Sequence, residues 1–90
     1  MHLPRVRSGK VKLPQLSVEE AFGQILRSIR NERGLSQEQL SFKSGHHRTY
    51  ISLLERGKKS PSLDTIFRIA QALAVRPSDL MRSVEAELGA

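Results

Sequence analysis

The chain has 90 residues, a length that one small domain accounts for. It contains no cysteine, so disulfide frameworks, thiolate metal sites and cysteine nucleophiles are excluded. Fifteen lysines and arginines against nine acidic residues give a formal net charge of +6, which favours a polyanionic partner, either nucleic acid or an anionic membrane surface.

Residues 1–16 differ in composition from the rest of the chain. They contain two prolines and a glycine, they show no helical periodicity, and they carry four basic residues without an acid. The basic residues are Arg5, Arg7, Lys10 and Lys12. We therefore expect a flexible basic N-terminal tail at 1–16 and a folded domain at 17–90. The tail is either a disordered leader or an arm that lies on DNA phosphates or in a minor groove.

Capping signals and apolar spacing predict the first helix at about 18–33. Ser17 is its expected N-cap, Glu20 completes a capping box, and Gly34 follows as the stop. Helical spacing gives it an apolar stripe made of Val18, Phe22, Ile25, Leu26 and Ile29.

The second predicted helix is short. Ser36 and Gln39 form its capping box, and Gly45 ends it after about eight residues. Its inner side carries Leu40, Ser41 and Ser44.

A third helix fits residues 47–55, with Ile51 and Leu54 three positions apart on its inner face. The connection from Gly45 to His47 is too short for antiparallel packing, so we expect the two helices to cross at roughly 90–120°. Gly45 permits the positive φ that this turn requires. In such a helix-turn-helix, the first helix lies across the DNA backbone and the second enters the major groove.

Two more helices complete the predicted fold. Ser62 caps the fourth, and Pro77 begins the fifth at about 77–88. The apolar stripe of the fourth helix is made of Leu63, Ile66, Ile69, Ala70 and Leu73. Because no alternating strand pattern or Asn-Gly hairpin occurs, the predicted fold class is all-α, with five helices.

The outer face of the third predicted helix carries the candidate base-reading residues. Periodicity places Arg48, Thr49 and Ser52 opposite the core face, with Tyr50 and Leu53 at the flanks. An arginine near the start of a groove-facing helix can bond O6 and N7 of guanine, and a threonine offers a hydroxyl and a methyl group. The alternative for Arg48 is a solvated surface arginine.

Polar and basic residues bracket this helix. Gln37 lies at the N-terminus of the second helix, where free N–H groups and the positive end of the dipole favour a phosphate. Arg56, Lys58 and Lys59 follow the third helix and add positive charge beside it. His47 either caps the third helix or contacts a phosphate.

Several motifs, in the same order, resemble the Cro/C1-type (XRE) helix-turn-helix family over about 22–81. They are Gly34-Leu35-Ser36-Gln37-Glu38-Gln39-Leu40, Ser44-Gly45, Arg48-Thr49-Tyr50-Ile51-Ser52, Leu54-Glu55-Arg56-Gly57-Lys58, Pro61-Ser62-Leu63-Asp64-Thr65 and Ala70-Gln71-Ala72-Leu73-Ala74-Val75. The third of these runs is also similar to the controller proteins of restriction-modification systems.

The resemblance implies a lambda-repressor-like domain of five helices that regulates transcription by binding double-stranded operator DNA as a two-fold homodimer. It implies base contacts from Arg48, Thr49, Ser52 and Leu53. It implies phosphate contacts from Gln37 and from the basic residues after the third helix, Arg56, Lys58 and Lys59. Ser36, His47 and Tyr50 complete the expected set of phosphate ligands. It also implies an internal ion pair between Arg30 and Glu55, which would make Glu55 structural. A two-fold dimer predicts a palindromic operator with half-sites about one helical turn apart.

Some positions depart from the family pattern. His46 stands where an aliphatic residue is usual, which leaves the packing of the turn open. Leu53 is apolar where a polar base reader is common, so it either contacts a thymine methyl group or is a bystander. Ile25 is apolar where the family is often basic, and it faces either the tail or a partner.

Other function classes have less support from the residues. The histidines His2, His46 and His47 lack metal-site spacing and no Gly-rich phosphate loop occurs, so no enzyme activity, metal or cofactor is expected. One Tyr and three Phe are few for stacking on single-stranded nucleic acid. Two rivals keep the fold: an antitoxin that binds a toxin protein and represses its own operon, and an adaptor without DNA binding.

No stretch approaches the ~18 apolar residues of a membrane span, and no signal-peptide run precedes the domain. We therefore expect no membrane association and a cytoplasmic protein. The apolar residues of the fifth helix, together with Phe67 or Ile25, either form the two-fold contact or serve the core of the monomer. These residues of the fifth helix are Leu80, Met81, Val84 and Leu88.

Overall fold

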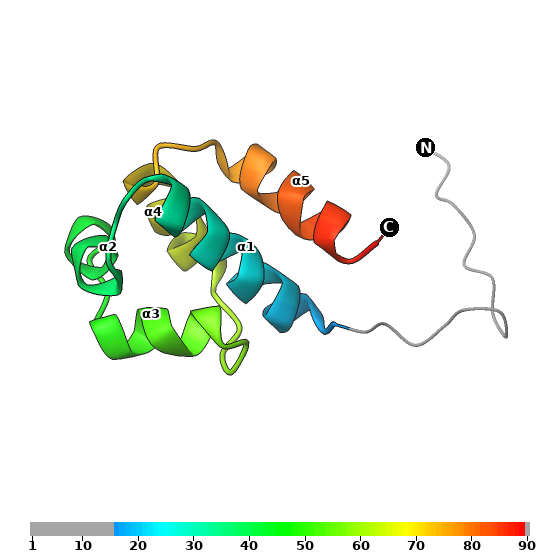
Figure 1. The fold of residues 1–90 in the computed structure, drawn as a ribbon, viewed down its shortest axis with the longest axis horizontal. Coiled ribbons are helices and arrows are strands. Elements are labelled where there is room, and N and C mark those ends of the chain that lie inside the picture. The colour runs from blue at the N-terminus through cyan, green and yellow to red at the C-terminus, as the bar shows by residue number, and fades with distance from the viewer. Residues whose placement is uncertain (1–15, 90) are drawn as a thin grey trace, which may run out of the picture.

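The computed structural model describes residues 16–89, which form five helices and no strand (Figure 1). The helices are α1 (Val18–Glu32), α2 (Gln37–Ser44), α3 (Arg48–Glu55), α4 (Leu63–Ala72) and α5 (Pro77–Glu87). The all-α prediction is confirmed, and the expected helix ends agree to within a residue or two. The predicted tail lies outside the described residues except for Leu16, which packs against the core.

The helix starts follow from local capping. Ser17 accepts a hydrogen bond from the backbone N–H of Glu20 at 3.0 Å, and the Glu20 carboxylate accepts one from the backbone of Ser17 at 2.9 Å. Ser36 and Gln39 form the same reciprocal pair at the start of α2. Ser62 accepts from the backbone N–H of Thr65 at the start of α4. Each bond satisfies an N–H that has no partner within its own helix.

A single core holds the five helices together. α1 packs against α3 and α5, α2 packs against α3 and α4, and α4 packs against α5. The largest fully buried side chains are Leu26, Leu40, Ile51, Leu54, Ile69, Leu73 and Leu80. Because α3 is packed on its inner side only, its other side forms the lower edge of the molecule in Figure 1.

Two residues of the predicted apolar stripes are exposed. Val18 is 60% exposed and Leu63 is 65% exposed, which corrects the expectation that they face the core. Each occupies the first position of its helix. Helical side chains point back toward the N-terminus, so at this position they extend past the end of the helix rather than onto a neighbouring one.

The fifth helix divides its apolar residues between the core and the surface. Leu80 and Val84 are buried and Leu88 packs partly against the core, whereas Met81 is 37% exposed. Ile25 is half-buried against the core. Phe67 on α4 is 58% exposed, so among the residues expected to form the two-fold contact it is more exposed than Met81.

α1 and the end of α3 approach each other at Gly23, a buried position inside α1. A Cβ atom added there would lie 2.5 Å from the carbonyl oxygen of Glu55 and closer still to that of Leu54. The close approach requires a residue without a side chain. None of the helices in the described part of the chain is long and apolar enough to span a membrane.

Candidate nucleic-acid interface

The two faces of α3 differ as the periodicity predicts. Ile51 and Leu54 are fully buried, while Arg48 and Thr49 are exposed at the first two positions of the helix. Ser52 and Leu53 are half-buried on the same outer side. The four candidate base-reading residues therefore share one surface, with Arg48 and Thr49 the most accessible.

The side chain of Ser52 has a neighbour along the helix. Nε of Arg56 donates a hydrogen bond to the hydroxyl oxygen of Ser52 at 3.4 Å. The Ser52 hydroxyl accepts this bond, so its own proton is available for a base acceptor. Arg56 is exposed and lies one turn beyond Ser52, at the end of the helix where the basic loop begins.

The turn between α2 and α3 is held by backbone bonds. Gly45 adopts φ 77°, as predicted, and its N–H donates to the carbonyl oxygen of Ser41 at 2.9 Å. The N–H of His46 donates to the same oxygen at 3.1 Å. This pairing closes α2 and starts α3 in a new direction, so α2 is seen nearly end-on in Figure 1 while α3 lies along its lower edge.

The two histidines of the turn have different surroundings. His46 packs its ring against Tyr50, with the ring centroids 5.2 Å apart. Its Nε2 atom is buried and has no hydrogen-bond partner among the described residues. Burial lowers the pKa of His46, the positive charge of Arg68 lowers it further, and Asp64 opposes both. His47 is exposed and is the N-cap of α3, but its side chain makes no capping bond.

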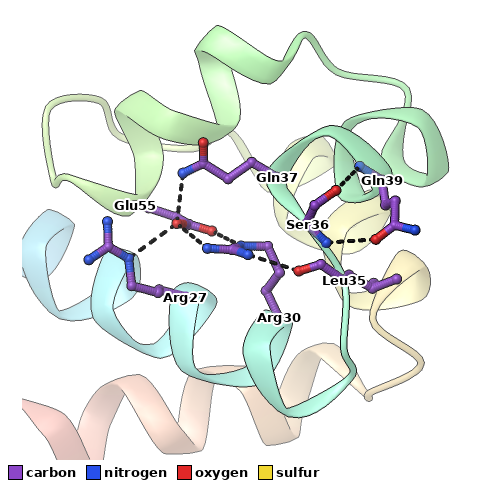
Figure 2. A network of polar contacts seen from close by, with 7 residues as sticks. All are labelled: Arg27, Arg30, Leu35, Ser36, Gln37, Gln39 and Glu55. Carbon is purple, nitrogen blue, oxygen red and sulfur yellow. Dashed lines mark hydrogen bonds and ion pairs between the residues drawn. The ribbon is translucent and has the colours of Figure 1, made fainter.

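Glu55, the last residue of α3, is the centre of a polar network (Figure 2). Its side chain is fully buried and receives both Nε and Nη2 of Arg30 on its two oxygens. Gln37 donates to it at 3.0 Å and Arg27 at 3.3 Å. Arg30 also donates to the carbonyl oxygen of Leu35 at 2.8 Å. The network connects α1, the start of α2 and the end of α3.

The protonation of Glu55 reflects this network. Burial by itself raises the pKa of the carboxyl group, but the hydrogen bonds and charge of Arg30, together with Gln37 and Arg27, outweigh burial and leave the pKa below its usual value. Glu55 is therefore ionised at neutral pH. A carboxylate that is fully buried and already paired is unavailable to DNA.

The network also changes what is expected of Gln37. One N–H of its amide is directed at Glu55, so the side chain acts first as a brace between α2 and α3. The amide has a second N–H, and α2 begins at this residue. The contacts of Arg27 and Gln37 with Glu55 were not anticipated from the sequence, although Arg27 lies one turn before Arg30 on α1.

The remaining candidate phosphate ligands lie around α3. Arg56, Lys58 and Lys59 are exposed in the loop after the helix, and His47 is exposed at its start. Tyr50 is half-buried against His46. Ser36 uses both its hydroxyl and its backbone N–H within the capping box of α2. Among the candidate phosphate ligands, the exposed basic side chains are therefore the most accessible to a phosphate.

The described residues contain no cluster of three or more His, Asp or Glu side chains that could hold a metal ion. The arrangement instead presents one helix edge with an arginine at its start and basic side chains after its end. Such a surface provides hydrogen-bond donors for base edges and positive charge for the phosphates beside them.

Comparisons with known proteins agree with this geometry. A helix-turn-helix family model matches residues 26–80. The control protein C.BamHI of Bacillus amyloliquefaciens is 51% identical over 61 residues, which cover 67% of this chain and 75% of that protein.

Two solved structures show similar folds. The restriction-modification controller protein C.AhdI from Aeromonas hydrophila superposes with a TM-score of 0.68 at 45% sequence identity, over 69% of this chain and 94% of that one. The controller protein C.Esp1396I, solved as a tetramer in complex with its natural 35-base-pair operator, superposes with a TM-score of 0.76 at 26% identity. That match covers 84% of this chain and 100% of the controller chain.

Proposed function

Because this chain belongs to the helix-turn-helix family, we propose that it regulates transcription by binding a palindromic operator in double-stranded DNA as a homodimer. The observation that carries the proposal is the outer face of α3, where Arg48 and Thr49 are exposed on a helix whose inner face is fully buried. Its relatives are DNA-binding regulators, and we assign this chain the same class rather than an enzymatic one. A DNA partner places its action in the cytoplasm.

We assign base recognition to Arg48, Thr49, Ser52 and Leu53. Arg48 has the reach and the two parallel donors that guanine O6 and N7 require. The methyl group of Thr49 and the side chain of Leu53 suit a thymine methyl group, and the hydroxyl of Ser52 suits a base acceptor. The Glu55 network supports this reading surface because it anchors the far end of α3 to α1 and α2.

We assign phosphate binding to residues around the reading helix. Arg56, Lys58 and Lys59 supply positive charge after α3, while Gln37 and Ser36 present the N-terminal end of α2. His47 and Tyr50 lie between these two groups in the chain. Contacts of this kind orient the domain on the duplex and do not distinguish sequences.

The uncovered face of α4 supports the homodimer. Phe67 and Leu63 lie four residues apart and are more than half exposed. Beside them, Asp64 and Arg68 form an ion pair at 3.0 Å that gives the apolar patch a polar rim. A two-fold contact through this face would cover the aromatic ring and set two α3 helices about 34 Å apart for successive major grooves.

The direct test is selection of random duplex DNA with the purified protein, followed by measurement of Arg48→Ala on the selected site. We expect an enriched palindrome and a loss of roughly 1–3 kcal/mol of binding free energy per half-site, with relaxed preference at one base pair.

Lys59→Ala is the matched control, because it should weaken selected and random duplexes alike. If Arg48→Ala also weakened both equally, Arg48 would be a phosphate ligand and the base-reading assignment would be wrong. If no sequence were enriched, the antitoxin alternative, with a toxin protein as partner, would become the better account.

A further inference from the structure

Arg27 on α1 is bonded to the buried Glu55 network but extends to the protein surface. Nε of Arg27 donates to Oε1 of Glu55 at 3.3 Å. The side chain of Arg27 is 55% exposed, whereas the side chains of Glu55 and Arg30 are 0% and 11% exposed. Its two outer nitrogens, Nη1 and Nη2, have no acceptor within residues 16–89. The guanidinium group is therefore held at one end and open to solvent at the other.

Glu55 is already satisfied without Arg27. Arg30 donates to both of its oxygens, and the charge of that arginine balances the carboxylate. The Oε1 atom accepts from Arg30 and Gln37 at 3.0 Å each and from Arg27 at 3.3 Å. A carboxylate oxygen has about two lone-pair sites, so the third and longest bond adds little to the pairing. This bond orients Arg27 and leaves the positive charge of the arginine unbalanced.

The start of α2 lies next to Arg27. Gln37, the first residue of α2, donates to the same Glu55 oxygen as Arg27, so the two donor groups are neighbours. Figure 2 shows Gln37 and Arg27 approaching Glu55 from different sides, with the outer nitrogens of Arg27 directed away from the carboxylate. In a helix-turn-helix, the first helix of the motif lies across the DNA backbone. A backbone phosphate at the start of α2 would therefore be within reach of the guanidinium group.

One face of α1 follows the end of α3 and the basic loop after it. A Cβ atom added at Gly57 would lie 2.7 Å from Cγ of Glu20, and one added at Gly23 would lie 2.5 Å from the carbonyl oxygen of Glu55. Arg27 is one turn beyond Gly23 and therefore lies on the same face of α1. Its unbalanced charge is thus close to both the start of α2 and the end of the reading helix.

We propose that Arg27 is a further DNA ligand, in which Nη1 and Nη2 bind a backbone phosphate beside the start of α2 while Nε stays on Glu55. The inference rests on the proposed function for its partner, duplex DNA, but not on the operator sequence. A guanidinium group matches phosphate oxygens with parallel N–H donors. Because Glu55 already holds the side chain, binding costs little additional side-chain entropy. α1 then contributes to the DNA-binding surface together with α2 and α3.

The test compares three single substitutions in the full chain. Arg27→Gln removes the charge, and Arg27→Lys keeps the charge without the guanidinium fork. The matched control is Arg33→Gln, because Arg33 is an exposed arginine at the end of α1 whose Nε also donates to a neighbouring element, the carbonyl oxygen of Leu73 at the end of α4, at 2.9 Å. Binding to the selected operator and to a random-sequence duplex is measured from about 0.05 to 0.3 M salt, the range in which phosphate contacts dominate the salt dependence.

For Arg27→Gln we expect the slope of log K against log salt to flatten by about one unit per protomer on both duplexes, with roughly fivefold weaker binding per protomer near 0.15 M salt. Arg27→Lys should keep the slope of the unaltered protein, because a positive charge still reaches the phosphate. Arg33→Gln should keep the slope as well. Melting temperatures should agree closely among the four proteins, since Arg30 still pairs with Glu55.

An unchanged slope for Arg27→Gln would overturn the proposal and leave Arg27 as a structural brace of Glu55. Equal flattening by Arg33→Gln would also overturn it, because the effect would then belong to overall charge. Flattening by Arg27→Lys as large as that by Arg27→Gln would contradict it too, since the loss would then come from the Glu55 network. The proposed function fails separately, by the absence of an enriched sequence, and the random duplex still reports on Arg27 in that case.

Discussion

The imidazole ring of His46 packs in the turn between α2 and α3, but its buried Nε2 atom makes no hydrogen bond to the described residues. From the family resemblance alone, it was not clear how a histidine would pack where an aliphatic residue is usual. In the structure the imidazole packs against Tyr50. The apolar contact suits an aliphatic site, but the buried Nε2 has no partner among the residues the structure describes. An unsatisfied buried nitrogen costs folding free energy, and protonation would add a charge near Arg68.

We predict that His46→Leu raises the free energy of unfolding at pH 7 by about 1 kcal/mol, because leucine removes the unpaired nitrogen and keeps the apolar contact. Urea denaturation at several pH values measures the effect. The folded protein holds the pKa of His46 below its ordinary value of 6.5, so the unfolded state binds more protons as the pH falls past that value. Stability of the unaltered protein should therefore decline below about pH 6.5, and His46→Leu should reduce that decline.

His47→Leu is the control for this experiment, because His47 is exposed and makes no side-chain capping bond. It should keep the acid decline of the unaltered protein. Identical pH profiles for the unaltered protein and His46→Leu would show that the buried imidazole has no energetic effect on the turn.

At the scale of the helices, the crossing of α1 and α3 determines where the reading face points. Gly23 lets the α1 backbone touch the last carbonyl groups of α3, and Glu55 at the same end of α3 receives its donors from α1 and α2. The close backbone packing at Gly23 and the hydrogen bonds of Glu55 therefore both fix the C-terminal end of α3. A shift of α3 at this end would disturb both.

We predict that Gly23→Ala lowers the free energy of unfolding by about 3 kcal/mol, since overpacking against backbone cannot be relieved by a rotamer change. Helix propensity alone predicts the opposite, a gain of up to about 1 kcal/mol. Thermal melting distinguishes the two, and a loss of this size should lower the melting temperature by more than about 10 °C.

Gln24→Ala is the matched control, because Gln24 is the exposed next residue of α1 and its replacement tests propensity without the crossing. It should leave the melting temperature nearly unchanged or slightly raised. A stabilised Gly23→Ala protein would mean that the two backbones do not approach as closely as the structure places them.

At the scale of the whole molecule, the uncovered apolar surface indicates which face joins two copies. The core uses Leu80 and Val84, so the fifth helix has little apolar surface left for a partner beyond Met81. Phe67 remains, in a shallow groove that it lines together with Val75 and Pro77. An exposed aromatic group beside apolar neighbours is typical of a protein interface.

We predict that Phe67→Glu converts the dimer to a monomer and weakens operator binding, because a carboxylate would be buried without a partner in the two-fold contact. Analytical ultracentrifugation measures the mass, and circular dichroism checks that the fold is kept, as expected for a side chain that is 58% exposed.

Phe42→Glu provides a matched control on α2, where the phenylalanine is 79% exposed. This variant should still sediment as a dimer. A monomeric Phe42→Glu protein and a dimeric Phe67→Glu protein would move the two-fold contact from α4 to α2.

Much of the fold was predictable because it depends on residues close together in the chain. The capping boxes at Ser17 and Ser36 span three residues each, and the left-handed Gly45 needs only its own lack of a side chain. Helical periodicity likewise separates Ile51 and Leu54 from Arg48 and Thr49 before any tertiary contact is known. The ion pair of Arg30 with Glu55 followed from the family resemblance, and the two groups do meet.

The sequence by itself therefore determined the five helices, their ends and the face of α3 that is free to meet DNA, because these depend on local bonds and helical period. Only the tertiary structure decided that Gly23 is a crossing point, that Gln37 and Arg27 share Glu55, and that the loop at Gly57 touches Glu20 in the first turn of α1. These features depend on backbones approaching each other across 18 residues or more of chain, as the separation of Gln37 and Glu55 illustrates. Such distances are set by how the whole core packs, and no local pattern records them.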